Sequence, residues 1–316
     1  MNLLVTGGCG FIGSNFIEQI INKKQVSKLV NLDSLSYAAN PDVATKWENH
    51  RAYHFNKADI SDYAKVHEIF YKHDIRHVVH FAAETHVDNS ILSPDAFIDT
   101  NILGTHNLLK AALHFNVRRF HHVSTDEVYG HLKKGEMKFH EGTPYNPRNP
   151  YSASKAAADF LVRSYFHTYD LPITISNCSN NYGPGQNAEK FIPTVINSLL
   201  DESKIPIYGD GENIRDWIHV KDHCSALWKI LTKGELGETY LVGADCEKTN
   251  LEIVTEICNI LDKNSKEYIS FVEDRKAHDF RYAICNHKIM TKLKWKPSIP
   301  LKKGLKKTVD HYKLKL

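Results

Sequence analysis

The sequence predicts an α/β fold in which helices cover both faces of a doubly wound parallel sheet, followed by a smaller C-terminal domain. Apolar runs of strand length alternate with amphipathic segments of helical length through the first half of the 316 residues. Turn-rich segments replace this alternation after the fifth run. Parallel sheets of this type bind ligands beyond the carboxyl ends of their strands, so we expect the functional residues there.

The expected elements follow from this alternation. Strands are expected at 3–6, 29–32, 78–82, 120–124 and 173–177. A helix is expected to begin near Tyr151, after a long surface loop at 131–150 that is rich in glycine and proline. A domain boundary is expected after Cys178. The last segment, 301–316, repeats apolar residues at helical spacing and carries lysines on its other side, which predicts a solvated helix face.

Composition argues against several kinds of partner and site. Lys and Arg total 40 against 37 Asp and Glu, and this net charge of +3 gives no reason to expect nucleic acid or an anionic membrane as a partner. The six cysteines show no Cys-x-x-Cys spacing and the 19 histidines are scattered, so neither a disulfide scaffold nor a metal site is expected. No apolar run approaches the ~18 residues of a membrane span, and the first residues lack a secretory leader pattern, which predicts a cytoplasmic protein.

The strongest local motif is a glycine-rich turn between the first strand and the following helix. Gly7, Gly10 and Gly13 fit Gly-x-x-Gly-x-x-Gly, and Gly8 completes the alternative Gly-x-Gly-x-x-Gly. Glycines here let a pyrophosphate approach the backbone amides of a helix N-terminus. Asp33 ends the second strand, where a carboxylate accepts hydrogen bonds from the ribose of NAD and repels the 2′-phosphate of NADP. The alternative is a tight strand-to-helix turn that holds no ligand.

Two further motifs carry groups suited to proton transfer. Tyr151 and Lys155 lie four residues apart at a helix start, so the ammonium can lower the pKa of the phenol and make it a base at neutral pH. Thr125, Asp126 and Glu127 follow the fourth strand, where burial and mutual repulsion would raise the pKa of one carboxyl and give one acid and one base. A chance helical spacing and a solvated turn are the alternatives for these two motifs.

Several longer segments together resemble the dTDP-glucose 4,6-dehydratase family of extended short-chain dehydrogenases/reductases, over nearly the whole chain. They are 6–13, 80–88, 124–130, 151–155, 177–184, 189–193 and 214–217. The resemblance implies an NAD-binding Rossmann domain at 1–178, to which 219–242 returns, and a region at 179–316 that mainly binds a nucleotide sugar. It also implies a homodimer or higher homo-oligomer that packs through helices, one of them supplied by 154–169.

The resemblance also implies a reaction. Tyr151, assisted by Lys155 and Thr125, would remove the proton of the hydroxyl at carbon 4 of the sugar while a hydride passes to NAD. Glu127 would then take the proton of carbon 5, and Asp126 would protonate the departing hydroxyl of carbon 6. The hydride returns to carbon 6, so the net reaction is loss of water. NAD is expected to stay tightly bound and to be recycled in each turnover.

The same resemblance, with the motifs above, assigns binding residues. Those expected to contact the cofactor are Gly7, Gly10, Phe11, Ile12, Gly13, Asp33, Asp59, Ile60, Ala82, Tyr151, Lys155 and Cys178, with Asp59 and Ile60 flanking the adenine. Those expected to hold the nucleotide sugar are Thr85, Asn180, Asn187, Lys190, Arg215, Asn250 and Arg281, the cations being suited to its diphosphate. The alternative for each of the latter is an ordinary surface residue.

Two departures from the family pattern concern the substrate. Residues 185–188 are Gly-Gln-Asn-Ala where the family usually has bulky aromatic residues, and Phe280 replaces the first of two adjacent arginines. The smaller side chains leave space for a 2-acetamido group, whose carbonyl Asn187 could hydrogen-bond. The departures therefore favour UDP-N-acetylglucosamine slightly over dTDP-glucose.

Other functions share parts of this pattern. A nucleotide-sugar 4-epimerase or a decarboxylating synthase would share the glycines, Tyr151 and Lys155, but neither expels the hydroxyl of carbon 6, so neither needs both Asp126 and Glu127. A catalytically silent regulator that binds NAD or a nucleotide sugar is a third alternative. The complete set of reactive residues favours the 4,6-dehydratase.

Overall fold

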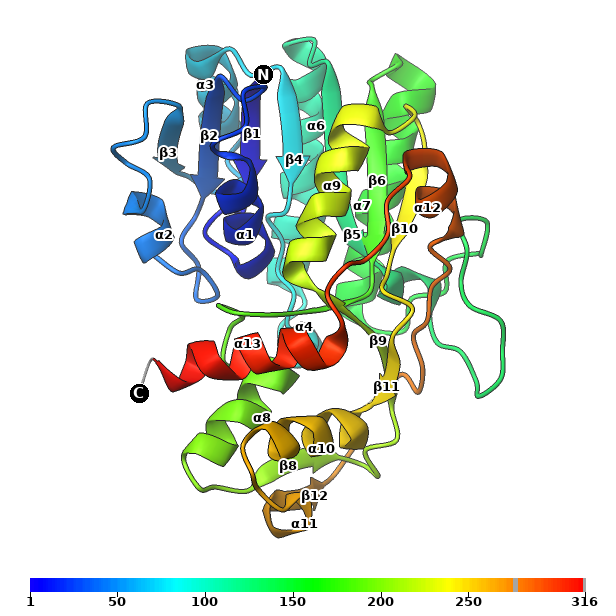
Figure 1. The fold of residues 1–316 in the computed structure, drawn as a ribbon. Helices are drawn as coiled ribbons and strands as arrows, with labels where there is room; N and C mark the ends of the chain where they lie inside the picture. Colours follow the sequence, from blue (N-terminus) through cyan, green and yellow to red (C-terminus); the bar gives the residue numbers. More distant parts are fainter. Residues whose placement is uncertain (275–277, 315–316) are drawn as a thin grey trace.

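The central element of the fold is a seven-stranded parallel sheet with helices on both faces (Figure 1). The computed structural model describes residues 1–274 and 278–314. The strand order is β10-β6-β5-β4-β1-β2-β3, so the chain winds outward in both directions from the pair β1 and β4. The strands are β1 (Asn2–Thr6), β2 (Lys28–Asp33), β3 (Tyr53–Lys57), β4 (His77–His80), β5 (Arg119–Thr125), β6 (Ile173–Cys178) and β10 (Thr239–Val242).

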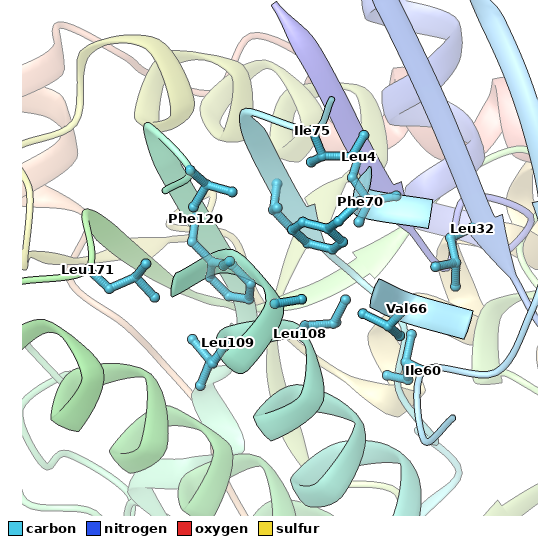
Figure 2. Close-up of a cluster of buried hydrophobic side chains, with 14 of the residues drawn as sticks. Leu4, Leu32, Ile60, Val66, Phe70, Ile75, Leu108, Leu109, Phe120 and Leu171 are labelled. Atoms are coloured by element: carbon cyan, nitrogen blue, oxygen red, sulfur yellow. The ribbon is translucent and has the colours of Figure 1, made fainter. Parts of the chain in front are cut away.

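One face of the sheet is covered by four helical elements. They are α3 (Tyr63–His73), the π-helix η1 (Ile98–Gly104), α6 (Thr105–His114) and α7 (Pro150–Tyr169). The apolar sides of α3, α6 and α7 meet the sheet in a core where Phe70, Leu108 and Phe120 are completely buried (Figure 2), and η1 packs against α6 and α7. The sequence fixes where α7 begins, because Asn149 and Ser152 form a reciprocal capping box and Pro150 has the φ that a first helical residue needs.

The opposite face is covered by α1 (Phe11–Ile20) and α9 (Val220–Lys233), which pack against each other. Phe16 of α1 and Leu227 of α9 are completely buried in one core with residues of β1 and β2. The chain reaches α9 and β10 after only the first part of the second region (residues 180–219), and β10 then pairs with β6 at the edge of the sheet. A further helix, α12 (His287–Leu293), packs against β10 and α9.

The second region lies below the carboxyl ends of the large sheet in the view of Figure 1. It contains a three-stranded sheet of β7 (Asn180–Tyr182), β9 (Ile214–His219) and β11 (Glu247–Thr249), and a parallel pair of β8 (Ile205–Tyr208) and β12 (Ile269–Val272). Its helices are α8 (Phe191–Leu200), α10 (Asn250–Ile260), α11 (Ser265–Tyr268) and α13 (Leu301–Lys313). Ile196, Ile257 and Val309 are completely buried in the core shared by α8, α10 and α13.

The predicted fold class is confirmed, and the differences are local. The strand expected at 78–82 ends as β4 at His80. The stretch expected as a surface loop at 131–150 forms no helix or strand before Pro150. Leu132 and Phe139 are nevertheless buried, because they pack in a hydrophobic cluster with Tyr129, Tyr282 and Ile284, and their backbones pair with Arg281 and Ile284. Lys302, Lys303, Lys306 and Lys307 of α13 are exposed as predicted, while the last two residues of 301–316 lie outside the described chain.

The remaining short elements connect the larger ones. They are α2 (Asp42–Thr45), α4 (Val87–Leu92), α5 (Asp95–Phe97) and the 3-10 helix η2 (Asp126–Tyr129). Over the part of the chain that the structure describes, no helix has the length and apolar character needed to cross a bilayer.

Candidate active site

A cavity of about 390 Å3 lies beyond the carboxyl ends of the central strands of the large sheet and extends to the segment between β7 and α8. Because the ends of parallel strands meet at one edge, most of the predicted site residues meet here. Those in its wall are Gly7, Gly10, Phe11, Ile12, Gly13, Asp33, Asp59, Ile60, Ala82, Thr85, Thr125, Asp126, Glu127, Tyr151, Lys155, Cys178, Asn180, Asn187 and Lys190.

The glycine-rich turn forms one end of the cavity. Gly7 has a φ of +67°, and an added Cβ would lie 2.7 Å from the backbone nitrogen of Ala82. An added Cβ at Gly13 would lie 2.2 Å from the carbonyl oxygen of Gly7. Gly10, which precedes α1, has a φ of −75°, and its Cβ would meet only that same oxygen, at 3.3 Å. Packing of the turn therefore requires Gly7 and Gly13, whereas Gly10 leaves open space in which an anion can approach the N-terminus of α1.

Asp33 lies at the end of β2 and is 7% exposed. Its Oδ2 accepts a hydrogen bond from the backbone N–H of Cys9 at 2.9 Å, and its Oδ1 accepts one from the N–H of Leu35 at 2.8 Å. Burial raises the pKa of Asp33, and the two backbone hydrogen bonds oppose this change. Each carboxylate oxygen retains a second lone pair, so the side chain can still accept hydrogen bonds from a ligand hydroxyl.

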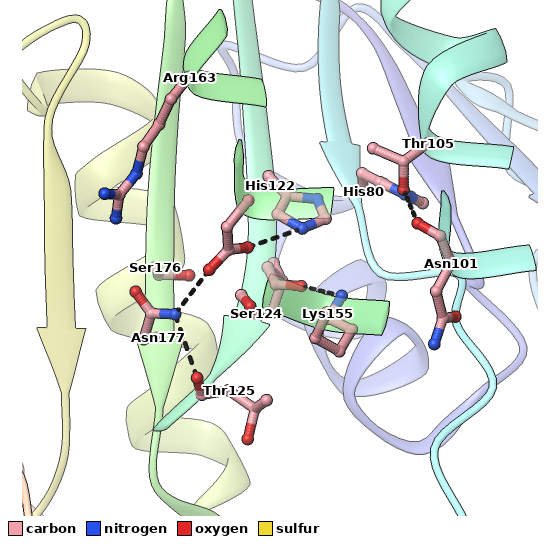
Figure 3. Close-up of polar contacts among 12 residues, drawn as sticks. His80, Asn101, Thr105, His122, Ser124, Thr125, Lys155, Arg163, Ser176 and Asn177 are labelled. Atoms are coloured by element: carbon pink, nitrogen blue, oxygen red, sulfur yellow. Dashed lines mark hydrogen bonds and ion pairs between the residues drawn. The ribbon is translucent and has the colours of Figure 1, made fainter. Parts of the chain in front are cut away.

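Tyr151 and Lys155 lie in the first two turns of α7, on the side of the helix that faces the cavity. The ammonium of Lys155 donates a hydrogen bond to the carbonyl oxygen of Val123 at 3.0 Å (Figure 3). Burial, followed by the charge of Glu127, raises the pKa of Tyr151 well above its ordinary value, and a hydrogen bond with Thr125 opposes this. The predicted lowering of this pKa by Lys155 is therefore wrong for this structure, because burial of the phenol dominates.

Thr125, Asp126 and Glu127 mark the turn from β5 into η2. The hydroxyl of Thr125 accepts a hydrogen bond from the backbone N–H of Glu127 at 3.3 Å and donates one to Oδ1 of Asp126 at 3.4 Å. Asp126 is 2% exposed, and its burial, reinforced by the charges of Glu127 and Asp216, raises its pKa well above the ordinary value. The prediction that one carboxyl of the pair has a raised pKa is confirmed for Asp126, which is thereby suited to donate a proton.

Comparison with known proteins agrees with this arrangement. The family model described as GDP-mannose 4,6 dehydratase matches residues 4–308. The dTDP-glucose 4,6-dehydratase of Haemophilus influenzae is 46% identical over 331 residues, which cover 99% of this chain and 98% of that protein. The chain belongs to the nucleotide-sugar 4,6-dehydratase family of extended short-chain dehydrogenases/reductases.

Solved structures support the same family of nucleotide-sugar 4,6-dehydratases. The dTDP-glucose 4,6-dehydratase DesIV of Streptomyces venezuelae, solved with NAD bound, is 40% identical with a TM-score of 0.95, and the match covers 99% of this chain and 97% of that one. The enzyme from Bacillus anthracis, also in complex with NAD, is 42% identical with a TM-score of 0.92 and the same coverage. The predicted class of NAD-dependent 4,6-dehydratase is thus confirmed at the level of the family.

The fold by itself does not separate 4,6-dehydratases from epimerases. The UDP-glucose 4-epimerase of Thermus thermophilus, solved with NAD, is 27% identical with a TM-score of 0.91, and the match covers 99% of both chains. The difference must therefore lie in the residues of the site rather than in the arrangement of strands and helices.

Three predicted substrate residues of this 4,6-dehydratase do not line the cavity. Arg215 on β9 donates a hydrogen bond to the carbonyl oxygen of Asp279 at 2.9 Å. The guanidinium of Arg281 binds both carboxylate oxygens of Glu247, at 2.6 and 3.1 Å. Asn250 is the first residue of α10. Both guanidinium groups therefore bind protein partners in this structure.

The other predicted substrate residues do reach the wall. Asn180 presents a buried Oδ1 that has no hydrogen-bond partner among the described residues. The ammonium of Lys190 donates a hydrogen bond to the carbonyl oxygen of Thr85 at 3.2 Å. Asn187 uses its Oδ1 to accept the backbone N–H of Glu189 at 3.1 Å, which stabilises the turn that leads into α8.

Two acidic residues of the wall received no role from the sequence. Glu84 and Glu189 both line the cavity. Burial, followed by the charges of Glu189 and Asp59, raises the pKa of Glu84, while Lys190 opposes this. Both residues lie within segments that carry the family resemblance, and this position is the feature of the sequence that could have indicated a place in the site.

Proposed function

We propose that this member of the family is an NAD-dependent dTDP-glucose 4,6-dehydratase that forms the 4-keto-6-deoxy sugar. The observation that carries the proposal is the meeting of Tyr151, Asp126 and Glu127 at one cavity. This set provides one group for oxidation at carbon 4 and two for removal of water across carbons 5 and 6. The choice of sugar nucleotide rests on the names of relatives such as those of Haemophilus influenzae and Neisseria gonorrhoeae, 46% and 47% identical to this chain.

The residues would act in sequence. Tyr151 would take the proton of the hydroxyl at carbon 4 in its phenolate form, and Thr125 would hold that hydroxyl in place. The raised pKa of Tyr151 in the single chain opposes this form, and the positive charge of a bound nicotinamide would favour it. Bound NAD supplies the acceptor for the hydride of carbon 4 and its source for carbon 6. Glu127 then removes the proton of carbon 5, which the new ketone acidifies, while Asp126 donates a proton to the departing hydroxyl. Glu127 would return its proton to carbon 5 as the hydride is delivered to carbon 6. The raised pKa of Asp126 supports this assignment, because a protonated carboxyl is available near neutral pH.

The residues present fit NAD. The open space at Gly10 suits the pyrophosphate, and the carboxylate of Asp33 suits the adenosine ribose. We place the adenine between Asp59 and Ile60, and the other half of the cofactor towards Ala82, Tyr151 and Lys155, with Gly7, Phe11, Ile12, Gly13 and Cys178 completing the contacts. Residues 1–178 with 219–242 would form the NAD-binding domain, and the rest of 179–316 would mainly bind the nucleotide sugar.

The residues on the substrate side of the cavity indicate a nucleotide sugar less specifically than those on the cofactor side indicate NAD. Lys190 would bind the diphosphate, and Thr85, Asn180 and Asn187 would contact the remainder of the substrate. Arg215, Asn250 and Arg281 would contact the substrate from the second region, and none of the three lines the cavity in this structure. The expected preference for UDP-N-acetylglucosamine has no support in the comparisons, whose relatives are named for dTDP-glucose. We therefore keep that sugar nucleotide as a competitor in the test.

Assembly and location complete the proposal. We propose a homodimer or higher homo-oligomer that acts in the cytoplasm and packs through α7. Support comes from Phe160 and Tyr169 of this helix, two aromatic residues that are 57% and 52% exposed in the single chain.

The experiment is incubation of the purified protein with dTDP-glucose and, separately, with UDP-N-acetylglucosamine, without added NAD. Mass spectrometry should show that dTDP-glucose loses one water with the wild-type protein and loses none with the Glu127→Gln variant. Loss from UDP-N-acetylglucosamine alone would overturn the substrate. Inversion at carbon 4 without loss of water would favour an epimerase, and no change in either compound, even with NAD supplied, would favour the silent regulator.

A further inference from the structure

Polar groups behind the cavity converge on a residue to which the sequence analysis assigns no role. Asp159 lies on α7, four residues after Lys155 and eight after Tyr151, so the three share one side of the helix. Its side chain is 0% exposed. Its Oδ2 accepts a hydrogen bond from Nδ2 of Asn177 at 3.0 Å (Figure 3). The same oxygen accepts one from the hydroxyl of Tyr145 at 2.8 Å.

Lys155 is a buried cation that needs a nearby negative charge. The residue is 4% exposed, and the carbonyl of Val123 that accepts its hydrogen bond is neutral. A buried charge is strongly unfavourable unless an opposite charge lies close to it. Burial lowers the pKa of Lys155, and Asp159 is the strongest of the groups that oppose this. Burial raises the pKa of Asp159, but His122 and Lys155 outweigh it and hold the carboxyl ionised.

His122, on β5, does not neutralise the charge of Asp159. Its Nε2 lies 3.2 Å from Oδ1 of Asp159, and both side chains are 0% exposed. Burial, followed by the charge of Lys155, lowers the pKa of His122 to about 4, so the imidazole is neutral at physiological pH. The neutral tautomer that suits this contact carries its proton on Nε2.

Among the charged or titratable groups described around Asp159 and His122, Lys155 is the buried group that carries a positive charge. Besides the catalytic residues, they are His80 on β4, Tyr129 on η2, Tyr145 in the loop before α7, Arg163 on α7 and Cys178 on β6. Arg163 is only partly buried, and its guanidinium donates a hydrogen bond to the hydroxyl of Tyr145 at 2.8 Å. Burial, with further lowering by Lys155, keeps His80 neutral through a strongly lowered pKa.

The carboxylate of Asp159 also connects α7 to the end of β5. The Nδ2 of Asn177 donates one hydrogen bond to Oδ2 of Asp159 at 3.0 Å and another to the carbonyl oxygen of Thr125 at 3.1 Å. An amide nitrogen carries two hydrogens, so both bonds form together. Thr125 is the last residue of β5 and directly precedes Asp126. The helix that carries Lys155 is thereby tied to the strand that carries the proton-transfer groups.

We propose that Asp159 is a positioning residue of the dehydratase, whose buried carboxylate balances the charge of Lys155 and, through Asn177, fixes Thr125 relative to α7. The inference rests on the proposed roles of Tyr151 and Lys155. Asp159 acts through its neighbours and not on the substrate.

The Asp159→Asn variant isolates the charge from the hydrogen bonds. An amide oxygen in the position of Oδ2 accepts the same bonds from Tyr145 and Asn177. The amide nitrogen then faces Nε2 of His122, which accepts a hydrogen bond in its other neutral tautomer. Shape and hydrogen bonding are kept, and the negative charge is lost.

The first readout is the pH profile of kcat and KM for the wild-type protein and Asp159→Asn. The alkaline limb, where Lys155 loses its proton, should move to lower pH by about one unit. In the range between the two limbs kcat should fall about tenfold, with KM little changed. The matched control is Asp222→Asn on α9, a 4% exposed carboxylate that binds Ser298 and the backbone of Ile299. This control should lower the Tm and leave the alkaline limb in place.

The second readout does not depend on catalysis. The Tm is measured for Lys155→Met, Asp159→Asn and the double variant. Each single change leaves one buried charge unbalanced, so the double variant should lose less thermal stability than the sum of the singles. If Asp159→Asn alone yields no folded protein, recovery of folded protein in the double variant shows the same coupling.

Additive losses of stability, no recovery of folding, or an alkaline limb that stays in place would each overturn the proposal. A wild-type protein without dehydratase activity would instead overturn the proposed function, since the stability cycle still tests whether Asp159 balances Lys155. The two failures are therefore distinguishable.

Discussion

Replacing Gly10 by alanine is expected to remove tight NAD binding while leaving the fold intact. Gly10 has a φ of −75° and a ψ of 172°, which alanine adopts without strain. Its added Cβ would meet one protein atom within 4 Å, the carbonyl oxygen of Gly7 at 3.3 Å. Alanine at a position preceding a helix costs about 0.5–1 kcal/mol relative to a better cap, which corresponds to a fall in Tm of about 1–4 °C.

The same methyl group has a larger effect on the ligand. It would occupy the open space in front of α1, where we place the pyrophosphate of NAD. Loss of one hydrogen bond between a backbone amide and a charged phosphate removes about 1.5–3 kcal/mol, so the Kd for NAD should rise about 10- to 100-fold.

The assay measures the Kd for NAD by calorimetric titration and, separately, the Tm of the protein without ligand. Gly13→Ala is the matched control, because its Cβ would lie 2.2 Å from the carbonyl oxygen of Gly7 and the turn must shift. Overpacking of this kind costs about 1–3 kcal/mol, so the control should lose stability as well as binding. Unchanged NAD affinity in Gly10→Ala would refute the placement of the pyrophosphate, and a loss of stability as large as that of Gly13→Ala would refute the steric reasoning.

Three further outcomes are expected. Burial raises the pKa of Asp216 from its ordinary value to about 6, so the stability that the protonated carboxyl contributes is present below about pH 4 and is lost as the pH rises through 6. Between pH 4 and 6 the Tm of Asp216→Asn should therefore fall less than the Tm of the wild type. An equally steep fall in both proteins would contradict the raised pKa. Phe120→Ala removes a completely buried ring under α6 and α7 and should lower the free energy of unfolding, measured in urea, by about 3–5 kcal/mol. A loss below about 1 kcal/mol would argue against close packing of this ring. Asp33→Asn removes the charge that would repel a 2′-phosphate, so the preference for NAD over NADP, taken from the two Kd values, should fall at least about tenfold, which is ~1.4 kcal/mol; an unchanged ratio would show that this carboxylate does not select the cofactor.

Much of the fold and site is predictable because a parallel sheet brings the ends of its strands together. The glycine turn, Asp33 and the segment from Thr125 to Glu127 each follow a predicted strand, so their meeting at one cavity follows from the fold class alone. Tyr151 joins them because a capping box and a proline define where its helix starts.

The rest depends on packing that the order of residues does not reveal. Asp159 follows three alanines in a helix, and nothing in that pattern indicates that its carboxylate is completely buried against β5 and β6. The partners of Arg281 and the direction of the pKa shift at Tyr151 likewise depend on which groups and how much protein surround each side chain. Charge spacing predicts which residues can interact, while tertiary contacts decide which ones do.

The return of the chain to the large sheet has a consequence for how the protein is made and how it can change. A ribosome releases β1 to β6 and α1 well before α9, so the apolar side of α1, including Phe16, waits for Leu227 while the intervening segment is synthesised. A fragment that stops at Cys178 would keep this surface uncovered and would end with β6 as an open edge of the sheet. The segments of the second region lie both before α9 and after β10 in the chain. Replacing that region, in evolution or by design, therefore needs new junctions on both sides of α9 and β10 if these two elements are to stay on the large sheet.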